Sequence, residues 1–270
     1  MALDIISYLM GGSGGKSGKV LTGAAAPADS LGENGDIYKR AMPLPENVHF
    51  VEYLESTGDT QYINTGIYAT QNIDAIVTAD RRSGNSYAGC ALGVRTGAYT
   101  SMSKALYFGS HSDNAGGLSV IKTGSANDGT TINLTGVSTR RTKTIRDENG
   151  AYVYWATIDE YPSYSKLYRQ TGTWTSDMPL CMFGFYNGTT LNYGNGVRVI
   201  RVTILDKGSP IADYLPCLDA SDVPCMWENV SGTYIYNTGT GTFLYGSDAT
   251  PEPLEDVYYI KHNSSWEVLS

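Results

Sequence analysis

Aromatic and hydrogen-bonding side chains gather in two stretches of the chain, 161–174 and 186–193. Tyrosine and tryptophan faces can stack on the C–H face of a sugar ring, and amide or guanidinium groups give directional hydrogen bonds to its hydroxyls. The residues of these types are Tyr161, Tyr164, Tyr168, Arg169, Trp174, Tyr186, Asn187, Asn192 and Tyr193. They are the candidate ligand-binding residues for a carbohydrate. The alternative is that the tyrosines coat a sheet surface or an interface between subunits.

Residues suited to hydrolytic catalysis are poorly arranged. A glycoside hydrolase needs two carboxylates placed across the sugar bond, whereas the acidic pairs Asp147–Glu148 and Asp159–Glu160 do not alternate along one strand face. The histidines lie far apart and have no nucleophile motif nearby; they are His49, His111 and His262. The sequence therefore predicts that the chain is not an enzyme. An unusual glycoside hydrolase that uses the second acidic pair is the competing hypothesis.

The cysteines do not form a recognisable motif. Cys90, Cys181, Cys217 and Cys225 are scattered through apolar or turn contexts, and no CxxC pair occurs. A small apolar residue within a strand explains them better than a bridge does. Cys217 and Cys225 could pair across one loop, but their spacing does not decide this. No HExxH or EF-hand pattern is present either, so the residues alone predict no metal and no cofactor.

Composition indicates sheets and excludes two classes of partner. Only 17% of the 270 residues are charged, and 31 Gly and 21 Tyr favour strands joined by tight turns. The net charge is −8 and basic residues are not clustered, so no positive face is available to bind nucleic acid. The apolar run Ile5–Leu9 is too short to insert into a membrane or to act as a signal peptide. Synthesis in a cytoplasm without export is therefore expected.

The elements that must position these residues form one large domain, whose ends match a known family. At its start the matching positions are Tyr53, Leu54, Glu55, Ser56, Thr57, Gly58, Gln61, Tyr62, Ile63, Thr65 and Gly66. At its end they are Pro216, Cys217 and Gly239–Phe243. In these residues the chain resembles concanavalin A-like (LamG-like) domains of phage and gut-bacterial proteins. The resemblance implies an all-β fold, a concanavalin A-like jelly-roll β-sandwich over residues 51–246.

The same resemblance carries an expectation about calcium, because domains of this kind can hold the ion on a rim loop. His111–Gly117 and Ser125–Gly129 contain the Asp and Asn residues such a loop uses, which are also ordinary turn residues. Inside the domain, Val197–Asp206 is predicted as a buried strand with Ile200, Val202 and Ile204 on one face.

The flanking segments predict smaller pieces. Residues 1–10 can form a short helix that would need a partner to dock on, and residues 11–30 have the Gly, Ser and Ala content of a flexible tether. Leu31–Tyr38 is predicted as a turn and short strand, and Val257–Val268 as a hairpin. These two segments resemble the halves of a small module of phage fibre proteins. Residues 31–50 and 251–270 would then be a split β module, the alternative being two unrelated aromatic tails.

These resemblances imply a bacteriophage virion protein. The expected role is a head fibre or decoration protein that displays a lectin-like domain to bacterial or mucosal glycan without catalysis. There are two alternatives: a tail-attached receptor-binding protein, and a purely structural capsid or tail component that binds no glycan. Fibre modules of this type commonly assemble in threes, so a homotrimer is expected, with residues 1–30 contacting a capsid or tail protein.

Overall fold

The fold is taken from a computed structural model. It describes residues 20–23, 27–32, 37–40, 42–57, 60–81, 89–97, 103–110, 118–124, 140–146, 151–158, 161–169, 172–187, 190–193, 196–254, 257–262 and 265–268. These residues form strands, turns and loops and no helix, which confirms the all-β prediction. In this part of the chain, therefore, no helix has the length and hydropathy to span a membrane. The helix expected over residues 1–10 lies outside the described residues.

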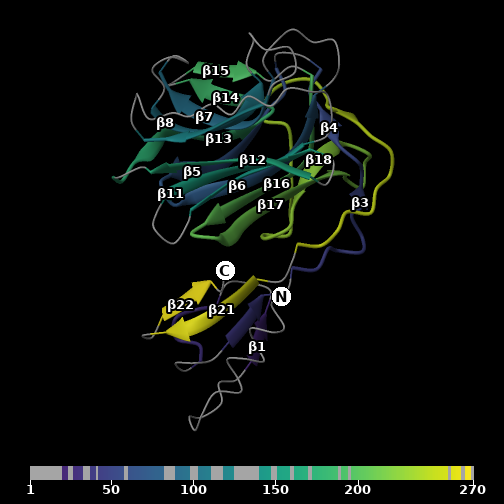
Figure 1. The fold of residues 1–270 in the computed structure, drawn as a ribbon. Helices are drawn as coiled ribbons and strands as arrows, with labels where there is room; N and C mark the ends of the chain where they lie inside the picture. Colours follow the sequence, from purple (N-terminus) through teal and green to yellow (C-terminus); the bar gives the residue numbers. More distant parts are fainter. Residues whose placement is uncertain are drawn as a thin grey trace. The chain divides into compact units, whose positions relative to one another are not determined.

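The chain divides into two compact units (Figure 1). One contains residues 1–44 and 252–270, and the other contains residues 45–251. In the smaller unit, segments from both ends of the chain share a four-stranded sheet of order β1-β2-β21-β22. Its strands are β1 (Val20–Gly23), β2 (Ile37–Arg40), β21 (Val257–His262) and β22 (Ser265–Val268). β1 runs parallel to β2, while β21 is antiparallel to both β2 and β22.

Strand β1 differs from the expectation of a tether over residues 11–30. Val20, Leu21 and Thr22 pair with Ile37, Tyr38 and Lys39. Valine and threonine favour the extended strand conformation because their branched Cβ restricts the side chain. A short apolar run inside a glycine-rich segment was therefore enough to form a strand once a partner edge was present.

The larger unit contains two sheets, which Figure 1 shows as stacked layers. The 11-stranded sheet has the order β12-β11-β10-β6-β16-β17-β18-β19, with β3 beside β17, β4 beside β16 and β20 beside β4. Its strands are β3 (His49–Phe50), β4 (Leu54–Glu55), β6 (Ile73–Arg81), β10 (Arg140–Arg146), β11 (Ala151–Ile158), β12 (Tyr161–Arg169), β16 (Val197–Asp206), β17 (Ser209–Leu218), β18 (Pro224–Glu228), β19 (Thr233–Ile235) and β20 (Leu244–Tyr245).

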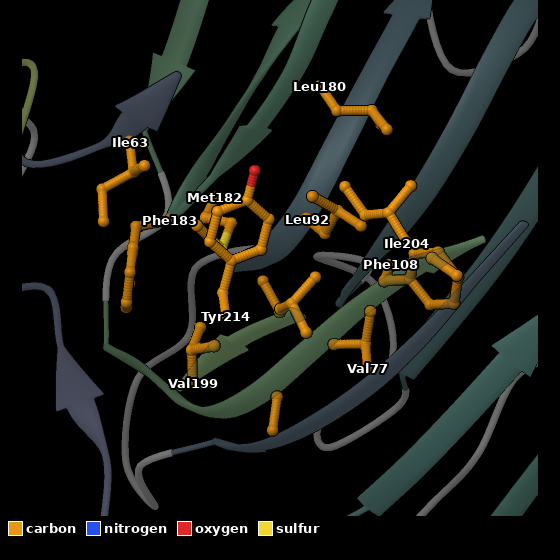
Figure 2. Close-up of a cluster of buried hydrophobic side chains, with 14 of the residues drawn as sticks. Ile63, Val77, Leu92, Phe108, Leu180, Met182, Phe183, Val199, Ile204 and Tyr214 are labelled. Carbon is orange, nitrogen blue, oxygen red and sulfur yellow. The ribbon is translucent and has the colours of Figure 1, made fainter. Parts of the chain in front are cut away.

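The second sheet is 7-stranded, with the order β15-β14-β7-β13-β5 and with β8 joining β7 to β9. Its strands are β5 (Ile63–Thr70), β7 (Cys90–Thr96), β8 (Ser103–Ser110), β9 (Leu118–Thr123), β13 (Thr175–Met182), β14 (Gly184–Asn187) and β15 (Thr190–Tyr193). Both sheets contribute side chains to one core, shown in Figure 2, so the unit is a β-sandwich. The 7-stranded sheet supplies Ile63, Leu92, Phe108, Leu180 and Met182, and the 11-stranded sheet supplies Val77, Val199, Ile204 and Tyr214.

A β-bulge in strand β16 corrects the prediction for Ile200. The register against β6 shifts between Val199 and Arg201, so the side-chain alternation changes phase at that point. Val199 and Val202 are both buried, whereas Ile200 between them is only half-buried. Strict alternation placed Ile200 on the core face with Val202 and Ile204; the extra residue of the bulge directs it out of the core.

Charged side chains are buried where strands β16, β17 and β18 meet. The carboxylate of Asp213 is fully buried, and it accepts hydrogen bonds from Arg201 Nε at 2.9 Å, Arg201 Nη2 at 2.8 Å and Thr203 Oγ1 at 3.0 Å. The carboxylate of Glu228 accepts the backbone N–H of Asp213 at 2.9 Å and that of Ser231 at 2.7 Å. A buried carboxylate is tolerated only with such partners. The network therefore fixes the register of three neighbouring strands.

The opening and closing segments of the larger unit are hydrogen-bonded to each other. The N–H groups of Thr238 and Thr240 donate to the carbonyls of Tyr62 at 2.8 Å and Thr60 at 2.9 Å. Between these two bonds Gly239 lies against the Thr60 carbonyl so closely that a Cβ at this position would overlap its oxygen. The glycine is needed for close approach of two backbones, because its φ is not in the left-handed region.

We expect Gly239→Ala to lower the free energy of unfolding by about 3 kcal/mol, at the upper end of what overpacking costs. The added methyl group would push the closing segment off the opening one, since the atom it meets is backbone and cannot rotate away. Gly66→Ala is the matched control: its φ is +71° but nothing lies within 4 Å of the new Cβ. This control should cost about 1 kcal/mol for the left-handed backbone alone. Urea denaturation of both variants checks this, and equal losses would contradict it.

Candidate functional site

A pocket of about 420 Å³ opens on the larger unit, a size within the range of small-ligand sites. It is formed where the opening segment, the ends of three central strands and the closing segment come together. Its lining residues are Val51, Glu52, Tyr53, Asp80, Arg198, Ile200, Pro216, Ala249 and Pro251. The bulge in β16 contributes directly, because Ile200 faces the pocket instead of the core.

Strand register brings the charged residues of the pocket into one row. On β16, Arg198 is paired on one side with Glu55 of β4 and on the other with Asp80 of β6. Directly opposed residues of neighbouring strands place their side chains on the same face of a sheet. Arg198 therefore lies between the carboxylates of Glu55 and Asp80, although the three residues are far apart along the chain.

Arg198 is held firmly in this row. Its Nε donates to Glu55 Oε2 at 2.8 Å, and its guanidinium lies 4.4 Å from the centre of the Tyr53 ring. The hydrogen bond to Glu55 raises the pKa of Arg198, and the charges of Glu55 and Asp80 act in the same direction. The Glu55 side chain is only 4% exposed, while that of Arg198 keeps 31% of its surface in solvent. Arg198 is therefore a fixed, partly exposed cation in the lining of the pocket.

Asp80 contributes a carboxylate to the lining of the same pocket. Its Oδ1 is buried and has no hydrogen-bond partner among the residues that the structure describes. Buried polar atoms are almost always paired, with protein or with water. Beside it, Ile200 and Pro216 give the pocket an apolar wall. A fixed donor, a carboxylate in the lining and an apolar surface are what a polyhydroxylated ring requires.

The candidate residues predicted from sequence are not brought into this pocket. Tyr161, Tyr164, Tyr168 and Arg169 lie on β12, at one edge of the 11-stranded sheet, and the positions of their side chains are outside the described structure. Tyr186 and Asn187 lie on β14, and Asn192 and Tyr193 on β15, at an edge of the 7-stranded sheet. Asn192 Nδ2 donates to the Thr190 carbonyl at 3.3 Å. The candidate set is thus divided between edges of two sheets.

Trp174 belongs to the core. Its side chain is 9% exposed and packs in the main hydrophobic cluster, while its backbone N–H donates to Gln71 Oε1 at 3.0 Å. A sugar ring cannot reach its face in this arrangement.

Several sequence expectations fall outside the described residues. These are the possible calcium segments His111–Gly117 and Ser125–Gly129 and the acidic pairs Asp147–Glu148 and Asp159–Glu160. In the part of the chain that is described, no group of three His, Cys, Asp or Glu side chains could hold a metal ion.

The pocket residues Asp80 and Arg198 were missed by sequence reasoning. Arg198 stands between Val197 and Val199 in a strand, a pattern that indicates an outward-facing polar residue. This pattern could have indicated that Arg198 points away from the core. It does not reveal that Glu55 and Asp80 lie beside Arg198, because that depends on the pairing of β16 with β4 and β6.

No protein-family model matches the chain, and no curated protein matches it. Among solved structures, the chain is similar to scytalido-glutamic peptidase with a peptide-based transition-state analogue, at 13% identity and a TM-score of 0.32. A second structure of that peptidase, with a transition-state analogue inhibitor, matches at 12% identity and a TM-score of 0.32.

A third solved structure is SCP-B, a member of the Eqolisin family of peptidases, in complex with the tripeptide Ala-Ile-His. It matches at 13% identity and a TM-score of 0.29, and all three matches cover 69% of this chain and 100% of the other chain. These matches are to enzymes and contradict the prediction that the chain is not one. Their low TM-scores assign no peptidase activity to this chain.

Proposed function

We propose that the chain is a bacteriophage virion protein whose larger unit is a concanavalin A-like jelly roll that binds a carbohydrate in the pocket of Tyr53, Asp80 and Arg198. The observation that carries the carbohydrate proposal is the pocket itself, where the carboxylate of Asp80 and the fixed side chain of Arg198, 31% exposed, lie beside an apolar wall. Sugar hydroxyls both donate and accept hydrogen bonds, so one ring can satisfy both groups while its C–H face covers Ile200 or Pro216.

The virion part of the proposal is supported by the sequence at both ends of the chain. The start and end of the larger unit resemble phage lectin-like domains, and the flanking segments resemble a split fibre module. The pairing of Ile37–Arg40 with Val257–His262 joins the two flanking segments in one sheet, which favours one split module over two unrelated tails. The proposed assembly is a homotrimer, mounted as a head fibre or decoration protein through residues 1–30. Labelling the protein on purified particles tests this part: its absence from the particle would end the virion proposal.

We expect the full chain to bind one class of glycan on an array, tested with and without calcium, and Asp80→Ala to weaken that binding at least tenfold. A hydrogen bond to a charged acceptor contributes about 1.5–3 kcal/mol, which corresponds to roughly ten- to a hundredfold in affinity. Isothermal titration with the best glycan of the array measures the change.

Tyr68→Ala is the control variant, because Tyr68 is 48% exposed and does not line the pocket; it should bind as the wild type does. Failure of the wild type to bind any glycan would reject the carbohydrate role and leave the structural alternative. If Asp80→Ala binds normally, the ligand is held elsewhere, and the aromatic residues of β12, β14 and β15 become the first surface to test. Mass spectrometry of the recovered glycans separates binding from cleavage.

A further inference from the structure

Cys217 and Cys225 face each other across two paired strands. They are directly opposed residues of β17 and β18, between the pairs Pro216–Met226 and Leu218–Pro224. Their sulfur atoms are 3.5 Å apart and both residues are fully buried. The two thiols are therefore in contact with each other and shielded from bulk solvent.

The backbone already has the separation that a disulfide needs. Opposed residues of antiparallel strands have Cα atoms roughly 4.5–5.5 Å apart, which lies within the roughly 4.4–6.8 Å that disulfides span. An S–S bond is about 2.05 Å long, so the sulfurs must approach by about 1.5 Å. Rotation about the Cα–Cβ bonds can supply that movement without a change in strand pairing.

We propose that Cys217 and Cys225 form an intrachain disulfide when the protein meets an oxidising medium that contains a small disulfide such as oxidised glutathione. The pair is selective within the chain. Cys90 and Cys181 lie on the neighbouring strands β7 and β13 of the other sheet, but they are not opposed residues, because Cys181 is paired with Gly93. They are expected to remain thiols.

The disulfide forms by two successive thiol–disulfide exchange reactions. The thiolate of one cysteine attacks oxidised glutathione, which gives a mixed disulfide and releases one glutathione thiolate. The thiolate of the second cysteine then attacks the protein sulfur of the mixed disulfide and releases the second glutathione. The protein loses two protons and two electrons, and the oxidised glutathione takes up both and is reduced to two thiols.

The fold controls the rate of this reaction. The hydrogen bond to Cys225 and burial raise the pKa of the Cys217 thiol, so little thiolate is present at neutral pH. Reaction in the folded state then waits for the β17–β18 hairpin to open. Oxidation during refolding avoids this barrier, because both thiols are exposed before the strands pair.

The test uses the full chain, incubated folded and also refolded from denaturant, in a buffer of oxidised and reduced glutathione. Alkylation under denaturing conditions counts the free thiols, and peptide mapping identifies any link. We expect the count to fall from the four cysteines of the chain to two in the refolded sample, with the link between Cys217 and Cys225. The folded sample should reach the same state more slowly.

A disulfide that closes a short loop should raise the melting temperature of the larger unit by on the order of 5 °C. Cys90→Ala should form the same link, whereas Cys225→Ala should keep its remaining thiols or carry glutathione as a mixed disulfide. Four free thiols after refolding, a link to Cys90 or Cys181, or links only between chains would each overturn the proposal.

Discussion

Replacing Arg201 with leucine should lower the free energy of unfolding by about 3–5 kcal/mol, because removal of one partner leaves a buried charge without compensation. The partner is Asp213, whose side chain is fully buried and receives two of its hydrogen bonds from Arg201. Thermal or urea denaturation of the full chain measures the loss.

A second ion pair in the same unit provides the control. Lys104 Nζ lies 2.7 Å from Asp177 Oδ1, but the two side chains are 40% and 47% exposed. Exposed pairs contribute little, so Lys104→Met should change stability by no more than about 1 kcal/mol. The double variant Arg201→Leu with Asp213→Leu should recover much of the loss, since apolar residues can replace a buried pair. A loss for Arg201→Leu as small as that for Lys104→Met would contradict the stabilising role of the buried Arg201–Asp213 pair.

Phe183→Ala should cost about 3–5 kcal/mol, the loss measured when a buried phenylalanine is truncated. Phe183 is fully buried between β13 and β14, with its ring centre 4.4 Å from that of Phe243 in the closing segment. Truncation leaves a cavity at the junction of the 7-stranded sheet with the closing segment. Denaturation monitored by tryptophan fluorescence measures the effect.

The backbone of Phe183 gives this prediction a second test. Its φ is +60°, a conformation that costs a residue with a Cβ roughly 1–2 kcal/mol and glycine almost nothing. Phe183→Gly should therefore be as stable as Phe183→Ala or more stable. At Phe108, which is also buried but has no positive φ, the order should reverse, with glycine worse than alanine. The same order at both positions would show that the backbone at Phe183 is not strained.

The class of fold could be predicted because its signals are local. Alternating apolar residues, β-branched residues and glycine turns indicated strands in Val197–Asp206 and Val257–Val268, and strands are present there. The error at Ile200 has a local cause as well. A bulge adds one residue to one strand of a pair, and nothing in the run VRVIRV distinguishes it from uninterrupted alternation.

The pocket could not be predicted because it depends on pairing between distant segments. Arg198 meets Glu55 and Asp80 only through the register of three strands from separate parts of the chain. Trp174 shows the converse difficulty: an aromatic residue in a polar, tyrosine-rich segment has the composition of a binding surface, yet the fold places it in the core. Sequence reasoning identified the residue types but not which of them would be exposed.

The pairing of the opening and closing segments has a mechanical consequence. Val51 is bridged to Asp248, and the N–H of Glu52 donates to the Ser247 carbonyl at 2.9 Å, so the larger unit begins and ends with chain segments that lie side by side. Tension applied to the two ends would separate these bonds one after another, as in unzipping. Force would reach the sandwich core only after these hydrogen bonds had broken. The pairing of the two end segments would therefore protect the core from small forces.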